Sequence, residues 1–595
     1  MGDRGRAGSS AAMTSRRGKL IVLSAAAAAG ALQLLASVGT PVGIYEDDAL
    51  HLRIARAVLG GARAFPFDPH VPVLPGLGLL LALPVRLLEP HWALFRAVGL
   101  LSVGAAFFFT RRLARRALPE DWASAAALLA ALSPVALGFA GAVLPDLPLM
   151  ALCAALFDAL AAAPRENARS RSGVLALMAA GACAASLLRP QGAILAACVG
   201  LGVFMKYGAR RGALFTTLSL LPLAGWLAFN HFAAGTISSY YSSYWRSQVA
   251  GLAGSEAGLV HAARLLTAIF ADALFPVARL PFALRLAAGL AGLVLACLGL
   301  SEGLRRSREP WIFAAGVYGV AILALHLTWQ PVEARYAMPL LPLLLVFILR
   351  AVHDRAGGRP PLSAALPAFF AAAALASGAV LALSRCRAPS AFQPETMKWL
   401  RENTPPDARV ESLEYNAVAL LAERDAVFPA TAGTRDAWLA AALAGQEGFL
   451  HVVPDFAAAA VSLKPHPAAA LLPSQLPLWA RSSPYIKEVY ADPAEGTVVF
   501  RLDHPDAARF LRAWSEYQIA GAAARGGHLG FARGRLRRAV ELEPELASAW
   551  AALGSIEPEP ALRRNDFERA ARADPTSAEI RRDLAAERAA RRDRR

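Results

Sequence analysis

Charged residues are scarce in this chain. They make up 18% of its 595 residues, against 56% hydrophobic residues, whereas a soluble globular protein carries about 25% charged residues. Cysteine is also rare: of five cysteines, Cys153, Cys183, Cys198 and Cys297 lie inside apolar runs, so a disulfide framework is excluded. The composition therefore excludes a soluble enzyme and indicates a membrane protein.

Long apolar segments recur as far as residue 384 and then stop. A helix that crosses a membrane needs about 20 predominantly apolar residues, and eleven segments are candidates. The first follows a basic flank but is too long for a signal peptide and has no clear cleavage site, so we interpret it as an uncleaved anchor. The eleven segments are 20–40, 92–111, 122–140, 145–163, 173–188, 190–206, 212–230, 282–300, 311–328, 336–352 and 362–384.

Arginine and lysine residues cluster in alternate loops. With eleven spans, the clusters all fall on the side of the basic N-terminus, residues 1–19, which the positive-inside rule assigns to the cytoplasm. The C-terminus is then outside. This assignment requires the proline-bearing segment 71–88 to lie at the outer interface without crossing. The net charge of +16 thus indicates topology and gives no reason to expect nucleic acid. The clusters lie at 111–116, 165–171, 206–211, 305–308 and 350–359.

Two further regions follow the apolar segments. Short apolar runs separated by helical stretches predict a small extracytoplasmic α/β domain over 385–505. Residues 508–590 resemble tetratricopeptide repeats, because the stretch Ala539–Pro544 recurs in altered form at Ala570–Pro575. About three repeats are needed for independent stability, so this helical region is either degenerate or docks on its neighbour. A surface that binds a partner protein and a structural cap are both open interpretations.

Acidic residues at the outer ends of two segments are candidates for chemistry. Asp47 and Asp48 open the first outer loop, 41–91, and Asp146 lies at the outer end of the fourth segment. An ionised group at the edge of the hydrocarbon is costly unless it has a partner or a task. The alternatives are ordinary loop acids for Asp47 and Asp48, and a helix cap for Asp146.

Basic and aromatic residues occupy the same predicted side. Arg189 and Arg335, the latter followed by Tyr336, lie at outer membrane ends, where arginine either snorkels to headgroups or binds a lipid phosphate through paired hydrogen bonds. His51, His70 and His326 are candidate bases or metal ligands, although no recognisable metal motif is present. His51 and His70 are also candidate contacts of the acceptor or sugar. Tyr240 and Tyr241 belong to a Ser- and Tyr-rich run of the loop 231–281 that either covers a sugar or forms an interfacial aromatic belt.

Together these features resemble the GT-C superfamily of membrane glycosyltransferases, in the branch of the protein O-mannosyltransferases and the bacterial aminoarabinose transferase. The resemblance covers residues 20 to about 384. It implies an α-helical polytopic membrane protein, followed here by the α/β domain and the helical repeat region. It is carried by Asp47-Asp48, the segment from His70 to Pro75, Asp146, Arg189-Pro190-x-Gly192, and Arg335-Tyr336 followed by Pro339 and Pro342.

The resemblance implies an inverting transfer of a monosaccharide from a polyprenyl-phosphate donor to an extracytoplasmic hydroxyl. Asp47 would be the base, and Arg189 and Arg335, with Tyr336, would bind the donor phosphate. Asp48 and Asp146 would orient the acceptor or the base, or hold a divalent metal ion, a choice that the sequence leaves open. No further cofactor is implied.

Two other functions are alternatives to this one. A transporter or lipid flippase should show internal repeats and charges near span centres, and neither is found in the sequence. A scaffold that presents the C-terminal repeats would not need eleven spans. The Ala- and Arg-rich composition suggests a GC-rich bacterium, and with it an inner-membrane protein whose C-terminal part is periplasmic.

Overall fold

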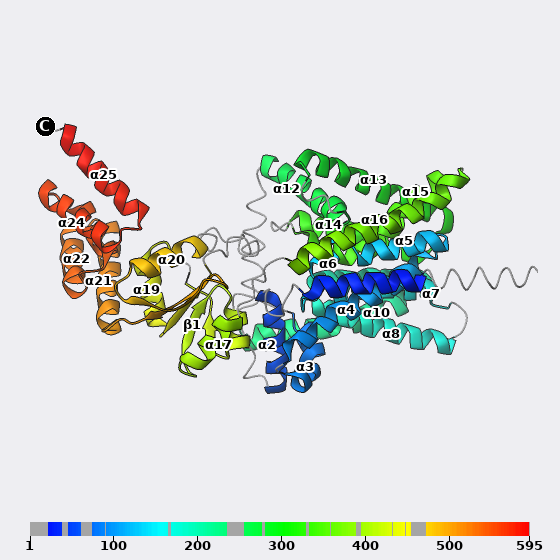
Figure 1. Ribbon diagram of the computed structural model, residues 1–595, viewed down its shortest axis with the longest axis horizontal. Coiled ribbons are helices and arrows are strands. Elements are labelled where there is room, and N and C mark those ends of the chain that lie inside the picture. The colour runs from blue at the N-terminus through cyan, green and yellow to red at the C-terminus, as the bar shows by residue number, and fades with distance from the viewer. Residues whose placement is uncertain are drawn as a thin grey trace, which may run out of the picture. The chain divides into compact units, whose positions relative to one another are not determined.

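The computed structural model divides into two compact units, residues 1–390 and 391–595. Within them, the structure describes residues 22–38, 46–60, 74–89, 91–164, 168–234, 255–275, 280–328, 333–357, 359–387, 394–430, 432–446, 448–453 and 472–593. Unit 1 is helical, with its long helices alongside one another and α2, α3 and α12 at one end of the bundle (Figure 1). Unit 2 holds a mixed sheet and a set of short helices.

Each of the eleven apolar segments contains a helix. Eight of the described helices are long and apolar enough to cross a membrane, while Val22–Val38, α7 and the apolar part of α8, Ser172–Leu188, are shorter. Their outward faces carry large apolar side chains, among them Leu221, Val294 and Phe369, as expected for surfaces in lipid. The chain is therefore a multi-pass membrane protein.

The helices of the bundle have the following bounds. They are Val22–Val38, α4 (Arg96–Ala114, after the short helix η2, Trp92–Phe95), α5 (Glu120–Ala131), α6 (Pro134–Gly138), α7 (Asp146–Ala162), α8 (Ala168–Leu188), α9 (Pro190–Tyr207), α10 (Ala209–Ala234), α12 (Ser255–Thr267), η3 (Ala268–Asp272), α13 (Phe282–Ser307), α14 (Pro310–Leu327), η4 (Ala334–Leu340), α15 (Leu341–Ala356) and α16 (Pro360–Arg387).

Small residues allow these helices to approach closely. A Cβ atom on Gly299 of α13 would lie 1.9 Å from the carbonyl oxygen of Phe347 on α15, so only glycine permits this backbone contact. Membrane helices pack through such small residues because lipid offers no hydrophobic force to drive them together.

The segment 71–88 yields a short helix within the described residues. Helix α3, Gly76–Leu88, has 13 residues, which span about 20 Å at 1.5 Å per residue and cannot cross a hydrocarbon core of about 30 Å. It packs on α2, Glu46–Gly60, where Gly78 meets Ile54. Its outward side exposes Leu79, Leu83 and Leu87, which fits a helix that lies in the interface.

Unit 2 contains a five-stranded sheet with the order β2-β1-β3-β5-β4. Strand β1 runs parallel to β2 and β3, while β5 is antiparallel to both β3 and β4. The apolar runs that predicted strands, 409–413, 449–453, 486–490 and 497–502, match four of the strands. The three-residue β2 was not predicted because it is too short to show a pattern. The strands are β1 (Arg409–Ser412), β2 (Asp425–Val427), β3 (Phe449–Val452), β4 (Ile486–Asp492) and β5 (Thr497–Leu502).

Helices pack on this sheet and continue beyond it. The α/β part contains α17 (Pro394–Asn403), α18 (Tyr415–Ala417), η5 (Val418–Ala422), α19 (Arg435–Ala444) and α20 (Leu472–Ser482). The helical region contains α21 (Ala507–Arg525), α22 (Leu529–Leu542), α23 (Ala547–Ile556), α24 (Pro560–Ala573) and α25 (Ala578–Asp593). One apolar core runs through both parts, from Trp438 and Phe500 to Phe510 and Trp550. The helical region thus docks on the α/β part.

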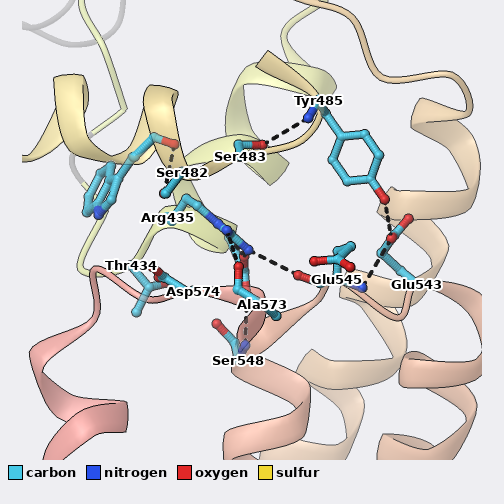
Figure 2. Close-up of polar contacts among 12 residues, drawn as sticks. Thr434, Arg435, Ser482, Ser483, Tyr485, Glu543, Glu545, Ser548, Ala573 and Asp574 are labelled. Carbon is cyan, nitrogen blue, oxygen red and sulfur yellow. Dashed lines mark hydrogen bonds and ion pairs between the residues drawn. The ribbon is translucent and has the colours of Figure 1, made fainter. Parts of the chain in front are cut away.

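A buried arginine joins the two parts (Figure 2). Arg435, 2% exposed, pairs with Asp436 at 2.9 Å and donates to the carbonyl oxygens of Ala573 (2.6 Å) and Glu545 (3.0 Å). Asp436 in turn accepts from the backbone N–H of Ser548 at 2.7 Å. Each group of this network has a partner in the helical region, which fixes the position of α23 and α24 against α19.

Replacing Arg435 by methionine should loosen the helical region. The change leaves Asp436 as a buried charge without its cation, which typically costs about 3–5 kcal/mol. Hydrogen exchange of residues 529–573 in the full-length protein should therefore become faster. Arg538→Met serves as the matched control, because Arg538 is exposed and takes part in a surface ion pair with Glu541, and it should leave exchange unchanged. Equal exchange in the two variants would show that the Arg435 network does not hold the parts together.

Candidate functional site

Two arginines from distant parts of the chain meet at one tyrosine. The guanidinium carbon of Arg189 lies 5.7 Å from the centroid of the Tyr336 ring, and that of Arg335 lies 5.4 Å from it. The side chains of Arg189 and Arg335 are 15% and 10% exposed. Both positive charges are therefore held inside unit 1, on the same aromatic side chain.

Each arginine has acidic partners. Arg189 pairs with Asp146 at 2.9 Å, and the Asp146 side chain is 1% exposed. Arg335 donates from Nη1 to Asp47 at 3.3 Å, and its Nε lies 2.5 Å from Glu333. The guanidinium groups thus point at carboxylates in the interior of the unit, which argues against the snorkelling alternative. The Asp47 carboxylate is the most open of the three, with 43% of its side chain exposed.

The turn between α8 and α9 explains how Arg189 reaches this position. Arg189 has an extended backbone, and Pro190 begins α9, a place where proline suits the helix because no N–H is needed there. Two residues on, a Cβ atom at Gly192 would lie 1.7 Å from the carbonyl oxygen of Ala185. Only glycine allows α8 and α9 to turn this tightly at Arg189.

Three helices begin at the site. α7 begins at Asp146, α9 at Pro190 and η4 at Ala334, immediately beside the paired residues. The free N–H groups and the dipole of a helix N-terminus favour an anion. Together with the two guanidinium groups, these helix starts create a positive environment that the three carboxylates balance.

The charges of the site act on one another. Burial raises the pKa of Asp47, but Arg335 and Arg189 outweigh it and hold that pKa below its usual value. Burial lowers the pKa of His51 to about 4, aided by Arg189 and opposed by Asp47, so this imidazole is neutral at pH 7. Burial raises the pKa of Glu333, where the negative Asp47 and Asp146 oppose the effect of Arg335. All these groups lie within electrostatic range.

The other predicted residues considered next fall into two groups. Asp48 and His51 are buried on α2 beside Asp47, whereas His70, Tyr240 and Tyr241 lie outside the described residues. Within the described part of the chain, no group of three or more His, Cys, Asp or Glu side chains could hold a metal ion. Glu333 was missed by the sequence analysis, although its place two residues before Arg335 was a usable signal.

Comparison with known proteins bears on the fold. No family model and no curated protein matches the sequence. Among solved structures, the archaeal oligosaccharyltransferase AglB from Archaeoglobus fulgidus, in complex with an inhibitory peptide and a dolichol-phosphate, aligns with a TM-score of 0.51 at 14% identity, over 82% of this chain and 75% of that one. ArnT from Cupriavidus metallidurans bound to undecaprenyl phosphate aligns with a TM-score of 0.51 at 14% identity, over 82% of this chain and 99% of that one.

These likenesses establish a class of fold. The chain has the fold of the GT-C membrane glycosyltransferases, so the resemblance drawn from the sequence is confirmed at the level of architecture. The identity is too low to carry residue roles across. What the site does must therefore be argued from its own geometry.

Proposed function

We propose that the chain is an inverting glycosyltransferase that moves a monosaccharide from a polyprenyl-phosphate donor to an acceptor hydroxyl. The observation that carries this proposal is the pair of arginines on Tyr336, set at three helix starts and next to a partly open carboxylate. Guanidinium groups suit a phosphate because they offer paired N–H donors. AglB and ArnT, which share the fold, were solved with a dolichol-phosphate and with undecaprenyl phosphate.

The proposed reaction needs one base and one stabilised leaving group. Asp47 accepts the proton of the acceptor hydroxyl as its oxygen attacks the anomeric carbon. The bond between that carbon and the phosphate oxygen breaks, and the phosphate leaves with the electron pair. Arg189 and Arg335 hold the developing negative charge, so protonation of the leaving group by an acid, as in glycosidases, is unnecessary.

Donor binding would also activate the base. In the described structure, Arg335 is shared between Asp47 and Glu333, and its charge is the strongest influence that lowers the pKa of Asp47. A carboxylate with a low pKa is a weak base. When the donor phosphate pairs with Arg335, the interaction of Arg335 with Asp47 weakens. The pKa of Asp47 then rises, so Asp47 becomes a stronger base beside the acceptor hydroxyl that it must deprotonate.

The pH dependence of transfer should reveal this coupling. Loss of Arg335 removes the main influence that lowers the pKa of Asp47 and leaves burial, which raises it. Asp47 then takes up a proton at a higher pH than in the wild type. In Arg335→Ala, the acidic limb of residual kcat/KM should therefore move to higher pH, whereas an unmoved limb would show that another group is the base.

Basic residues at the helix ends indicate on which side of the membrane the proposed site lies. Helices α4, α9, α13 and α15 carry basic residues in their last turns, whereas α7 and α9 begin at the site. The site thus lies at the opposite end of the bundle from these basic residues. The positive-inside rule assigns the basic end to the cytoplasm, and therefore the end with the site to the outer face. We infer an inner-membrane protein with the N-terminus inside and unit 2 outside, and a hexose or pentose as the transferred sugar. Residues 508–590 would recruit a protein partner or the acceptor.

Transfer by purified protein tests the proposal directly. Radiolabelled polyprenyl-phosphate sugars are offered with a simple acceptor alcohol, and both the released lipid phosphate and the labelled product are followed. Equal amounts of both products are expected, with inverted anomeric configuration. Movement of intact donor across a vesicle membrane with no transfer would instead support a flippase.

A further inference from the structure

Unit 1 contains a buried histidine that the proposed reaction does not use, His326. His326 lies in the last turn of α14, is 3% exposed, and its ring stacks on Tyr336 with centroids 5.1 Å apart and planes at 13°. Tyr336 is the same ring that Arg189 and Arg335 face. His326 and the two arginines therefore contact the same aromatic ring.

The ring of His326 has no hydrogen-bond partner among the described residues. Its backbone oxygen lies 2.9 Å from Nε2 of His261, so the end of α14 is tied to α12. Neither ring nitrogen of His326, in contrast, has a hydrogen-bond partner in the described part of the chain. Leaving a buried polar group unsatisfied is destabilising, and such groups in native proteins call for an explanation.

A ligand in the site would supply that explanation. The positive Arg189 lies within electrostatic range of the imidazole, so a second cation would be disfavoured there, whereas a phosphate oxygen would accept from a ring N–H. The stack on Tyr336 fixes the plane of the imidazole, which lets it offer this hydrogen bond without first becoming ordered.

We propose that His326 is a further donor-binding residue, which donates a hydrogen bond from its imidazole to the phosphate held by Arg189 and Arg335. This inference rests on the proposed function, since it assigns a new contact to the same phosphate. It adds a neutral donor to the two charged ones, and it makes Tyr336 the platform that positions all three.

The test compares binding of two lipids that differ only in the phosphate. Undecaprenyl phosphate and undecaprenol are titrated into purified full-length wild type, His326→Phe and His326→Gln, and the thermal stability of each protein without lipid is measured. Phenylalanine keeps the stack on Tyr336 but has no N–H. It should weaken binding of undecaprenyl phosphate about 10- to 100-fold, the contribution typical of a hydrogen bond to a charged group, and leave undecaprenol binding unchanged.

Two features distinguish this role from a structural one. Because His326→Phe removes an unsatisfied polar group, the lipid-free protein should melt at the same or a higher temperature than wild type. His326→Gln keeps an N–H donor and should bind better than the phenylalanine variant. His353→Phe is the matched control, since His353 likewise contacts an aromatic ring, in its case edge-on to that of Trp122, but belongs to the last turn of α15.

Each outcome decides one question. Wild-type binding of undecaprenyl phosphate in His326→Phe would overturn the inference and leave the proposed function intact. A lowered melting temperature together with weaker binding of both lipids would assign His326 a structural role and also overturn it. A wild-type protein that binds both lipids equally would instead refute the phosphate site, and with it the proposed function.

Discussion

Replacement of Asp47 by asparagine should reduce the rate of sugar transfer about 100- to 10,000-fold at saturating donor and acceptor, the usual contribution of a general base. Asparagine preserves the size of the side chain but cannot accept a proton. Donor binding should survive or become tighter, because Arg335 loses one of the two carboxylates that share it. The measurements are kcat from product formation and the dissociation constant of undecaprenyl phosphate.

Glu333→Gln is the matched control for this experiment. Glu333 pairs with the same guanidinium at 2.5 Å, but only 19% of its side chain is exposed, against 43% for Asp47. The control therefore removes an equal charge from Arg335 without removing the more accessible base. A rate loss in Glu333→Gln equal to that in Asp47→Asn would show that charge at Arg335, and not proton transfer at Asp47, controls the rate. Undiminished turnover in Asp47→Asn would move the role of base to Asp48 or Asp146.

The fold was largely predictable because its signal is local. A membrane helix can be recognised from about 20 consecutive, mainly apolar residues, and each of the eleven predicted segments contains a helix. The positions of the basic loops required that 71–88 not cross, and α3, with 13 residues, is too short to do so. The α/β part was recognisable from four apolar runs, whereas the short β2 depends on its pairing with β1 and left no pattern of its own.

Four charged residues of the candidate site could be selected from the sequence, but their pairing could not. Alternation of spans placed Asp47, Asp146, Arg189 and Arg335 on one side, yet nothing in the sequence says that Asp47 faces Arg335, 288 residues later. That pairing depends on how α2 and η4 pack, which is a tertiary property. Glu333 was not predicted either: its place two residues before Arg335 shows that the two residues are close in the chain, whereas the pairing of their side chains comes from the structure.

The division of the C-terminal part shows another limit of local reasoning. Composition separates 385–505 from 508–590, whereas the structure groups both in one compact unit with a continuous apolar core. Short helical hairpins that cannot bury their own faces need such a neighbour. A variant truncated after Asp503 would remove the share of that core that the helical region contributes, including Phe510 and Trp550, so the contribution of the helical region to acceptor choice is better tested by substitutions on its surface.

Replacement of Arg335 by alanine should weaken binding of undecaprenyl phosphate by at least about 30-fold, because truncating one partner of a buried, hydrogen-bonded charge pair typically costs about 2–5 kcal/mol. Arg335 is the only residue shown to contact Asp47, Glu333 and the Tyr336 ring together within the described residues. Its loss removes a phosphate partner and leaves two carboxylates facing the site, and both effects disfavour an anion. Arg335→Lys should recover binding only in part, since an ammonium group cannot reproduce the planar fork of N–H donors.

The ion pair between Arg285 and Asp272 provides the control for this loss. It joins α13 to η3 in unit 1 and is likewise largely buried, whereas the arginines on the Tyr336 ring in the described part of the chain are Arg189 and Arg335. Arg285→Ala should therefore reduce stability without a selective loss of affinity for the phosphate, which is measured as the ratio of undecaprenyl phosphate to undecaprenol binding. If Arg285→Ala and Arg335→Ala lower that ratio equally, the weaker binding reflects general damage to the bundle. If only Arg335→Ala lowers it, Arg335 binds the phosphate of the donor. The phosphate is then held next to Asp47, where Asp47 can deprotonate the acceptor, so the Arg335 guanidinium takes part in both donor binding and catalysis.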